Sequence, residues 1–116
     1  MYEDKARELG RLIGQGGEFQ ALQRAEDALR QDATALDLLR MVQELREKAG
    51  TLIESGQQPP EEMEKELEAL LNQVQSNPSY QRLMIAQQKL DELMQKVNQL
   101  ISEGIQLGAK SSIILT

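Results

Sequence analysis

The chain has 116 residues, which is enough for one compact domain but too few for two ordinary ones. Nineteen acidic residues against thirteen basic ones give a net charge of −6, which argues against a protein that binds nucleic acid by neutralising phosphates. Cysteine and histidine are both absent from the sequence. Disulfides, iron–sulfur clusters and thiol chemistry are therefore excluded, as are the commonest general base and the commonest transition-metal ligand.

The sequence contains no segment that resembles a targeting signal or a membrane anchor. It opens with the acidic stretch Met1-Tyr2-Glu3-Asp4, whereas a signal peptide begins with basic residues followed by an apolar run. The longest apolar run is four residues, Leu83–Ala86, against roughly 20 needed to span a bilayer. We expect a soluble, cytoplasmic protein with no membrane contact.

Two helices are predicted in the first 30 residues. Residues 2–14 form the first, because apolar side chains recur every three or four positions: Tyr2, Ala6, Leu9 and Ile13. Residues 18–30 form the second, with an apolar face of Phe19, Leu22, Ala25 and Leu29. Gly14, Gly16 and Gly17 lie between them and weaken the helix by about 1 kcal/mol each. A true break and a kink in one long helix both remain open.

A third helix is predicted over residues 33–55, with Asp32 as its N-cap. Its apolar side chains are Leu36, Leu39, Val42, Leu45, Ala49, Leu52 and Ile53, with Leu38 and Met41 beside them. Gly56 ends this helix, and Gln57-Gln58-Pro59-Pro60 forms a loop.

A fourth helix begins at Pro60 or Glu61 and ends near Ser76. Glutamates crowd its first turns, where the positive end of the helix dipole favours them. Its buried face is predicted to be Met63, Leu67, Leu70, Leu71 and Val74.

The fifth and longest helix is predicted over residues 78–107, with Pro78 in its first turn and apolar residues repeating every seven positions. At 1.5 Å per residue it would be roughly 45 Å long, whereas a spherical domain of this size is roughly 35 Å across. The sequence therefore predicts an all-α protein, a single domain built as an elongated antiparallel bundle of about five helices with a long C-terminal helix. The apolar stripe along this helix comprises Leu90, Leu93, Met94, Val97, Leu100 and Ile101. Two uses of the stripe remain open and can coexist: it covers the third helix as part of the core, or the part of the helix that protrudes packs on a second chain through these residues. Residues 108–116 lose the pattern and are expected to be a flexible or docking tail.

Catalytic chemistry finds little support in the sequence. The glutamates of residues 61–68 and the pair Asp91-Glu92 lie on polar helix faces, where contact with water removes the advantage that a catalytic carboxylate needs. Di-iron bundles need histidine, and no calcium loop or phosphate-binding loop is present. We therefore predict no catalytic residue, no metal and no cofactor. One enzymatic alternative is a chorismate-mutase type of helical protein, with Arg24, Arg40, Arg46 and Lys48 as candidates, although none lies at the centre of an apolar stripe.

The order of these features resembles the YlbF/YmcA family of small helical bacterial regulators. The resemblance begins at Tyr2-x-x-x-Ala6-x-x-Leu9-x-x-x-Ile13 and continues at Gly16-Gly17-Glu18-Phe19-Gln20 and Asp32-x-x-Ala35-x-x-Leu38. Pro59-Pro60-Glu61, Asn77-Pro78 and Leu83-x-x-Ala86-x-x-x-Leu90 complete it, so that it covers residues 2–107. Gly16 replaces the serine usual in the family, and the chain lacks the cysteines that some relatives use for an iron–sulfur cluster.

The resemblance implies a non-enzymatic regulatory or adaptor protein that acts by oligomerisation and protein–protein binding. It implies a role in phosphorelay, competence, sporulation or biofilm control, or in mRNA processing with the ribonuclease RNase Y. The partners would be a second copy, a related helical protein, a regulatory protein or a ribonuclease. Glu18, Phe19, Asn77 and Pro78 are the matching motif residues, with structural roles. A holdase-like chaperone, suggested by five methionines and glutamine-rich helices, is the main alternative.

Overall fold

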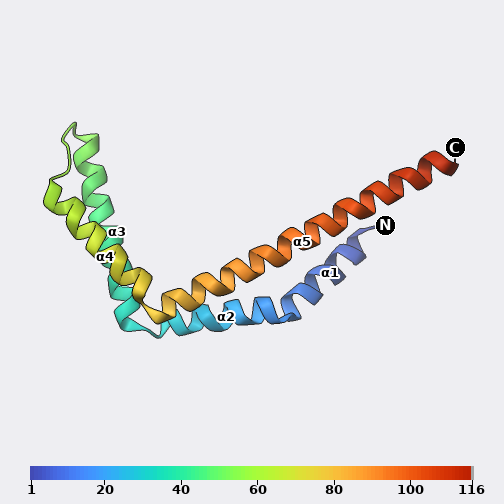
Figure 1. Cartoon of the computed structure of the whole chain (residues 1–116), viewed down its shortest axis with the longest axis horizontal. Coiled ribbons are helices and arrows are strands. Elements are labelled where there is room, and N and C mark those ends of the chain that lie inside the picture. Colours follow the sequence, from blue (N-terminus) through green and yellow to red (C-terminus); the bar gives the residue numbers. More distant parts are fainter. Residues whose placement is uncertain (116) are drawn as a thin grey trace. The chain divides into compact units, whose positions relative to one another are not determined.

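The computed structural model describes residues 1–115 of the chain and the side chains of residues 1–110. It contains five α-helices, which are α1 (Glu3–Gln15), α2 (Gly17–Arg30), α3 (Ala33–Glu54), α4 (Glu61–Ser76) and α5 (Pro78–Leu115) (Figure 1). Residues 1–115 contain no strand, so the all-α prediction is confirmed. None of the helices within this range combines the length and apolarity that crossing a membrane requires.

The chain forms two compact units. One consists of Met1–Leu22 with Ala86–Thr116, and the other is the continuous segment Gln23–Ile85. Helices α2 and α5 each contribute residues to both units. The grouping of all residues into a single domain stays a prediction.

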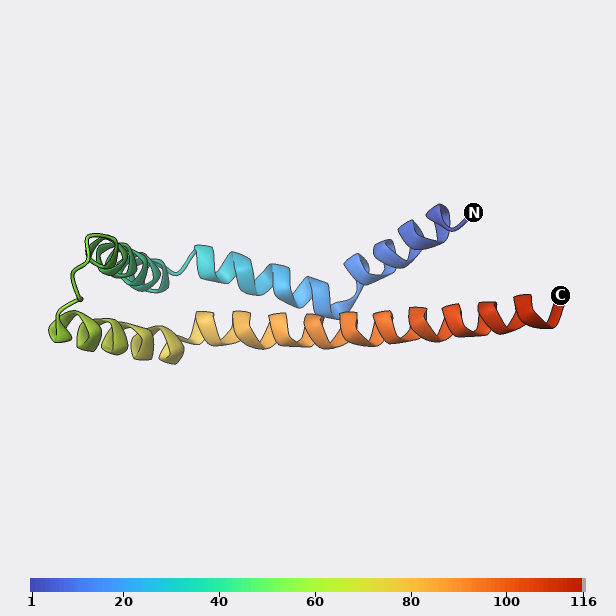
Figure 2. The ribbon, with the colours of Figure 1, turned by 90° about the horizontal axis from the view of Figure 1, so that it is seen from above.

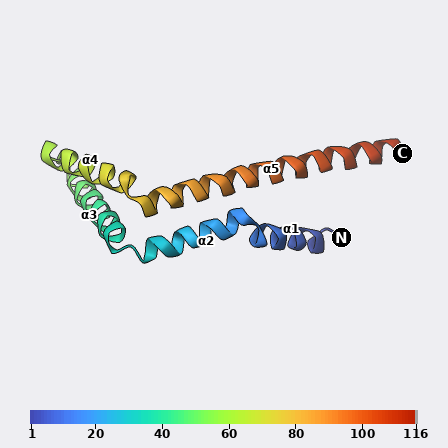
Figure 3. The ribbon, with the colours of Figure 1, turned by 60° about the horizontal axis from the view of Figure 1, so that its bottom comes forward.

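The hydrophobic core of the Gln23–Ile85 unit lies in an antiparallel hairpin formed by α3 and α4 (Figures 1 and 3). Val42 and Leu45 of α3 pack against Leu70 and Val74 of α4, and all four are at most 8% exposed. Partly buried side chains surround them, namely Leu38, Leu39, Met63, Leu67, Leu71 and Tyr80. The three- and four-residue spacing therefore identified the packed face of α4 and part of that of α3.

Three large residues of the predicted apolar face of α3 are exposed and do not belong to this core. Leu36 is 43% exposed, Met41 is 45% exposed and Ile53 is 63% exposed. Leu36 lies nine positions before Leu45, which is about two and a half helical turns and places it on the opposite side of α3. Ile53 lies in the last turn of α3, at the loop end of the hairpin.

The loop between α3 and α4 begins with a glycine-dependent helix stop. Gly56 has φ +80°, the left-handed conformation that side chains with a Cβ adopt only at a cost. Its amide donates to the Ile53 carbonyl at 3.0 Å, and the Gln57 amide donates to the Leu52 carbonyl at 2.8 Å. These two bonds form a Schellman motif, which satisfies carbonyls at the end of α3. The predicted stop at Gly56 is thus confirmed.

Matched glycine substitutions separate backbone conformation from packing. Gly56→Ala is expected to lower the free energy of unfolding by about 1 kcal/mol, because the left-handed conformation penalises a Cβ even where space is free. Gly50 lies inside α3, where a Cβ also has free space but the backbone is helical. Gly50→Ala should therefore raise the free energy of unfolding by up to about 1 kcal/mol. Urea unfolding followed by circular dichroism measures both. Equal effects of the same sign would contradict this account.

A single non-helical residue separates α1 from α2. Gly16 has extended backbone, with φ −74° and ψ 162°, and its amide donates to the Ile13 carbonyl at 3.1 Å. Figure 2 shows the resulting change of direction between α1 and the start of α2. A Cβ at Gly16 would lie 3.3 Å from the Ile13 carbonyl oxygen, so this position is tight. The glycines therefore produce a break between two helices.

Helix α5 continues to Leu115, beyond the end predicted near Leu107. Gly104 and Gly108 weaken a helix but do not stop one, because each costs only about 1 kcal/mol relative to alanine. The predicted end was therefore wrong. The idea that residues 108–116 flex or dock depends on side chains from residue 111 onward, which lie outside the described residues.

Candidate interaction surfaces

An apolar stripe along α5 is the main candidate interface. The six predicted residues share one side of the helix, since they recur at intervals of three and four. Leu90, Leu93 and Val97 are half-buried. The other three are exposed, with fractions of 37% for Met94, 55% for Leu100 and 47% for Ile101. Ile105 extends the same stripe and is 67% exposed.

Helix α1 belongs to the same unit as this stripe and also leaves apolar side chains uncovered. It buries none of its own residues, and Leu12 is 55% exposed. Among the described residues of this unit, Ala86 is the one buried side chain. Exposed apolar side chains gathered along a helix, as in the α5 stripe, are typical of sites where other molecules bind.

A polar cluster within the Gln23–Ile85 unit joins two helix junctions. Asp32 lies between α2 and α3, and its Oδ1 accepts a hydrogen bond from the Ala35 amide at 3.0 Å, which confirms the predicted N-cap. The second carboxylate oxygen accepts from the Ser79 hydroxyl at 2.8 Å and from the Asn77 side-chain amide at 3.4 Å. Asp32 thus ties the start of α3 to the start of α5.

The hydrogen bonds to Asp32 hold the pKa of its carboxyl below the ordinary value of 3.8. The Ala35 amide has the largest effect and the Ser79 hydroxyl the next largest, with a smaller one from the Asn77 side-chain amide. All three donate to the charged form and so favour it, which outweighs the opposing effect of partial burial. The carboxylate is therefore a structural anion, not a proton-transfer group at neutral pH.

The four motif residues occupy helix starts. The Oδ1 of Asn77 accepts from the Tyr80 amide at 3.0 Å, and Pro78 is the first residue of α5. Glu18 and Phe19 are half-buried in the first turn of α2. Sequence reasoning missed the contact between Asp32 and Ser79, which are 47 positions apart. Each lies beside a helix start, but the spacing of residues along the chain does not show that the two junctions meet.

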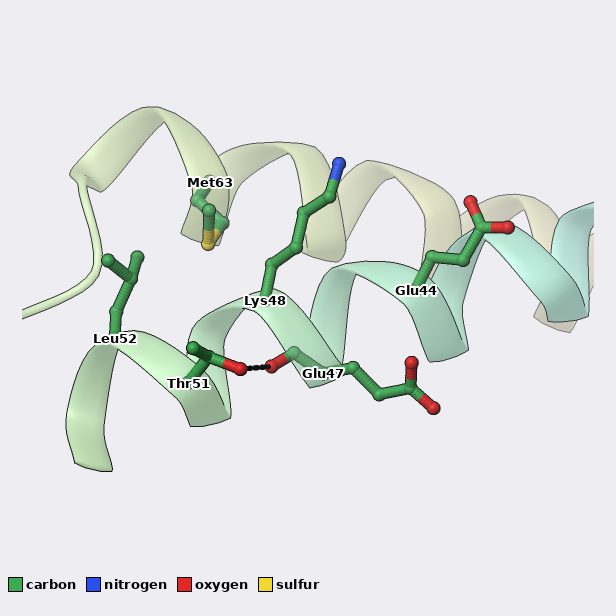
Figure 4. A pocket seen from close by; sticks show the side chains of 6 residues that line it. All are labelled: Glu44, Glu47, Lys48, Thr51, Leu52 and Met63. Atoms are coloured by element: carbon green, nitrogen blue, oxygen red, sulfur yellow. Dashed lines mark hydrogen bonds between the residues drawn. The ribbon is translucent and has the colours of Figure 1, made fainter. Parts of the chain in front are cut away.

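An open groove lies along the α3–α4 hairpin. It has a volume of about 580 Å³ and is lined by Glu44, Glu47, Lys48, Thr51, Leu52 and Met63. Figure 4 shows Leu52 of α3 and Met63 of α4 lying near each other at one end. Both are half-buried, and the carboxylates of Glu44 and Glu47 lie toward the other end of the groove (Figure 4). The site therefore combines an apolar end with charged side chains.

The described side chains do not assemble a catalytic constellation. Within residues 1–110 no polar or charged side chain is buried, and no group of three acidic residues is placed to hold a metal ion. Of the four basic residues considered for a chorismate-mutase type of site, Lys48 lines the groove, whereas the three arginines do not. Arg40 instead forms surface ion pairs with Asp37 at 3.4 Å and Glu44 at 3.7 Å.

The chain matches known bacterial proteins along most of its length. Residues 2–106 match the family model described as "Control of competence regulator ComK, YlbF/YmcA". A UPF0342 protein of Limosilactobacillus fermentum is 36% identical over 103 residues, covering 89% of this chain and 86% of the relative. A UPF0342 protein of Streptococcus mutans is 31% identical over 107 residues, covering 92% and 95%.

A solved structure shares the fold. It is described as a protein of unknown function (DUF964) from Bacillus stearothermophilus, with a TM-score of 0.63 and 22% sequence identity. The match covers 90% of this chain and 92% of that one. At this identity the likeness concerns the helical architecture alone.

Proposed function

Because this chain belongs to the YlbF/YmcA family, whose description concerns control of a competence regulator, we propose that it is a non-enzymatic regulatory adaptor. It associates with a second copy, or with a related helical protein, through the apolar stripe of α5. A regulatory protein or a ribonuclease is the kind of further partner that such an assembly binds. The mechanism is mass action: partner binding stabilises one assembly and thereby changes the partner's activity.

One observation carries this proposal, namely the exposure of the α5 stripe. Leu100 and Ile101 are about half exposed although they continue a seven-residue repeat that is half-buried nearer the start of α5. A repeat of seven favours packing against another helix along a left-handed seam. Covering this stripe removes apolar surface from water, which lowers the free energy of the assembly by about 25 cal/mol for each Å² buried.

Introducing charge into the stripe tests self-association. The double substitution Leu100→Glu and Ile101→Glu is expected to raise the dissociation constant of the dimer by about tenfold or more, because two carboxylates would be desolvated at the contact. Both positions are exposed, so helical content should be unchanged by circular dichroism. Light scattering coupled to size exclusion, over a dilution series, measures the dimer.

The matched control places the same charges elsewhere on the same turn. Asn98→Glu with Gln99→Glu changes the net charge equally at two exposed positions outside the stripe, and should leave the dimer intact. A wild-type chain that stays monomeric at every concentration would refute self-association. Dissociation by both double variants would refute the assignment to this stripe.

A holdase-like chaperone is the second candidate, favoured by the exposure of methionine side chains. Met41, Met84 and Met94 are 45%, 39% and 37% exposed, and flexible thioethers adapt to varied apolar surfaces. A holdase would suppress aggregation of unrelated unfolded proteins at near-stoichiometric amounts, whereas a dedicated adaptor would not.

A further inference from the structure

The negative charge of the chain is concentrated in the outer half of the α3–α4 hairpin. Residues 44–68 contain eight acidic and three basic side chains, a net charge of −5 within a chain whose total is −6. Five of the acidic residues are glutamates in the first half of α4, and all five are exposed. Fields from exposed charges extend about 10 Å at 0.1 M salt, so the groove between these helices lies within them.

Apolar surface lies inside this acidic region. The half-buried Leu52 and Met63 form one end of the groove, and the neighbouring Ile53 is 63% exposed. The aliphatic stem of Lys48 adds further apolar lining, while its amine is the one positive charge among the lining residues. Glu44 and Glu47 supply two negative charges on the same side of α3. The groove therefore presents apolar surface and negative potential side by side.

We propose that this groove binds a basic amphipathic helix of a different protein, with an apolar side chain on Leu52 and Met63 and cationic side chains near Glu44 and Glu47. Amphipathic helices bind apolar grooves in this way, and opposite charges speed encounter and set orientation. Charge complementarity selects the occupant. A second copy would bring the same −5 hairpin and be repelled, whereas a cationic helix is attracted. The inference rests on the adaptor function, since it names the chemistry of the partner.

A synthetic probe tests the groove directly. The probe is a fluorescent amphipathic helical peptide made of leucine and lysine alone, and its counterpart has glutamate in place of every lysine. Fluorescence anisotropy should show that the full-length protein binds the lysine peptide but not the glutamate peptide. Raising the salt from about 0.05 M to about 0.5 M should weaken binding, because the attraction is screened. In the ¹H–¹⁵N spectrum, the amides of Leu52 and Met63 should shift.

Charge reversal at the groove should weaken this binding specifically. Glu44→Lys with Glu47→Lys is expected to raise the dissociation constant of the lysine peptide by about tenfold. Both side chains are exposed, so the fold should survive. The matched control, Asp91→Lys with Glu92→Lys in α5, makes the same change in net charge at exposed positions of the other unit. It should change the dissociation constant less than twofold.

Three outcomes would overturn the proposal: no binding of the lysine peptide, equal weakening by both double variants, or amide shifts confined to α5. Failure of this proposal is distinguishable from failure of self-association, which is measured separately by light scattering. A monomeric protein that binds the peptide at the groove would refute the dimer and leave the groove assignment standing. A dimeric protein that does not bind the peptide would refute the groove assignment and leave the dimer standing.

Discussion

Replacing Leu45 with alanine is expected to lower the free energy of unfolding by about 3 kcal/mol. Leu45 is 8% exposed and packs in the cluster that holds α3 against α4. Removing three carbon atoms from such a site loses transfer free energy and leaves a cavity, because the surrounding side chains relax only in part. Denaturation by urea, followed by far-UV circular dichroism, measures the loss.

The control for this substitution is Leu36→Ala on the same helix. Leu36 is 43% exposed on the side of α3 away from the core. Its substitution should therefore lower the free energy of unfolding by less than about 1 kcal/mol. Helix propensity changes equally in the two variants, and the difference between them therefore reports packing. Equal losses for both variants would show that the hairpin is not held by this cluster.

Removing the Asp32 carboxylate is expected to lower the melting temperature by on the order of 5 °C at neutral pH. Asp32→Ala loses the N-cap of α3 and also the acceptor for the Ser79 hydroxyl. Thermal melts compare it with Asp37→Ala, which removes one exposed ion pair of α3 and should have little effect. Ser79→Ala, combined with Asp32→Ala in a double-mutant cycle, separates the link between junctions from the cap itself.

The effect of Asp32→Ala should depend on pH in a defined direction. The folded pKa of Asp32 lies below its ordinary value of 3.8, so the unfolded chain takes up a proton first as pH falls. The contribution of the carboxylate is therefore complete above about pH 5 and is lost as pH falls through the folded pKa. The difference in melting temperature between the wild type and Asp32→Ala should be smaller near pH 2.5 than near pH 6. A difference that grows on acidification would contradict this assignment.

Local features of the fold were predictable from the sequence because their causes are local. The N-cap at Asp32, the stop at Gly56 and the start of α5 at Pro78 each depend on residues within a few positions. The end of α5 was not predictable in the same way, because glycine weakens a helix without deciding whether it ends. The position of the break at Gly16 was not predictable either, because the neighbouring Gly14 and Gly17 have the same backbone freedom to leave the helical conformation.

Features that depend on distant residues were harder to predict. The hairpin core follows from helical periodicity, yet the opposite-side position of Leu36 required knowing which face of α3 meets α4. The groove was not predicted because Leu52 and Met63 were assigned simply to buried faces, and Glu44 and Glu47 were not considered. Their combination becomes visible once the two helices are side by side.

The link between Asp32 and Ser79 also bears on the order in which the chain folds. Closing 47 positions of unstructured chain would cost considerable entropy, whereas the short loop between α3 and α4 closes cheaply. If the hairpin forms first, the start of α3 and the end of α4 are already close together. The Asp32 carboxylate then reaches the Ser79 hydroxyl at little further cost in entropy. We expect the folding nucleus to lie in the hairpin. The hydrogen bond from Ser79 to Asp32 would then form late and stabilise a hairpin that has already folded.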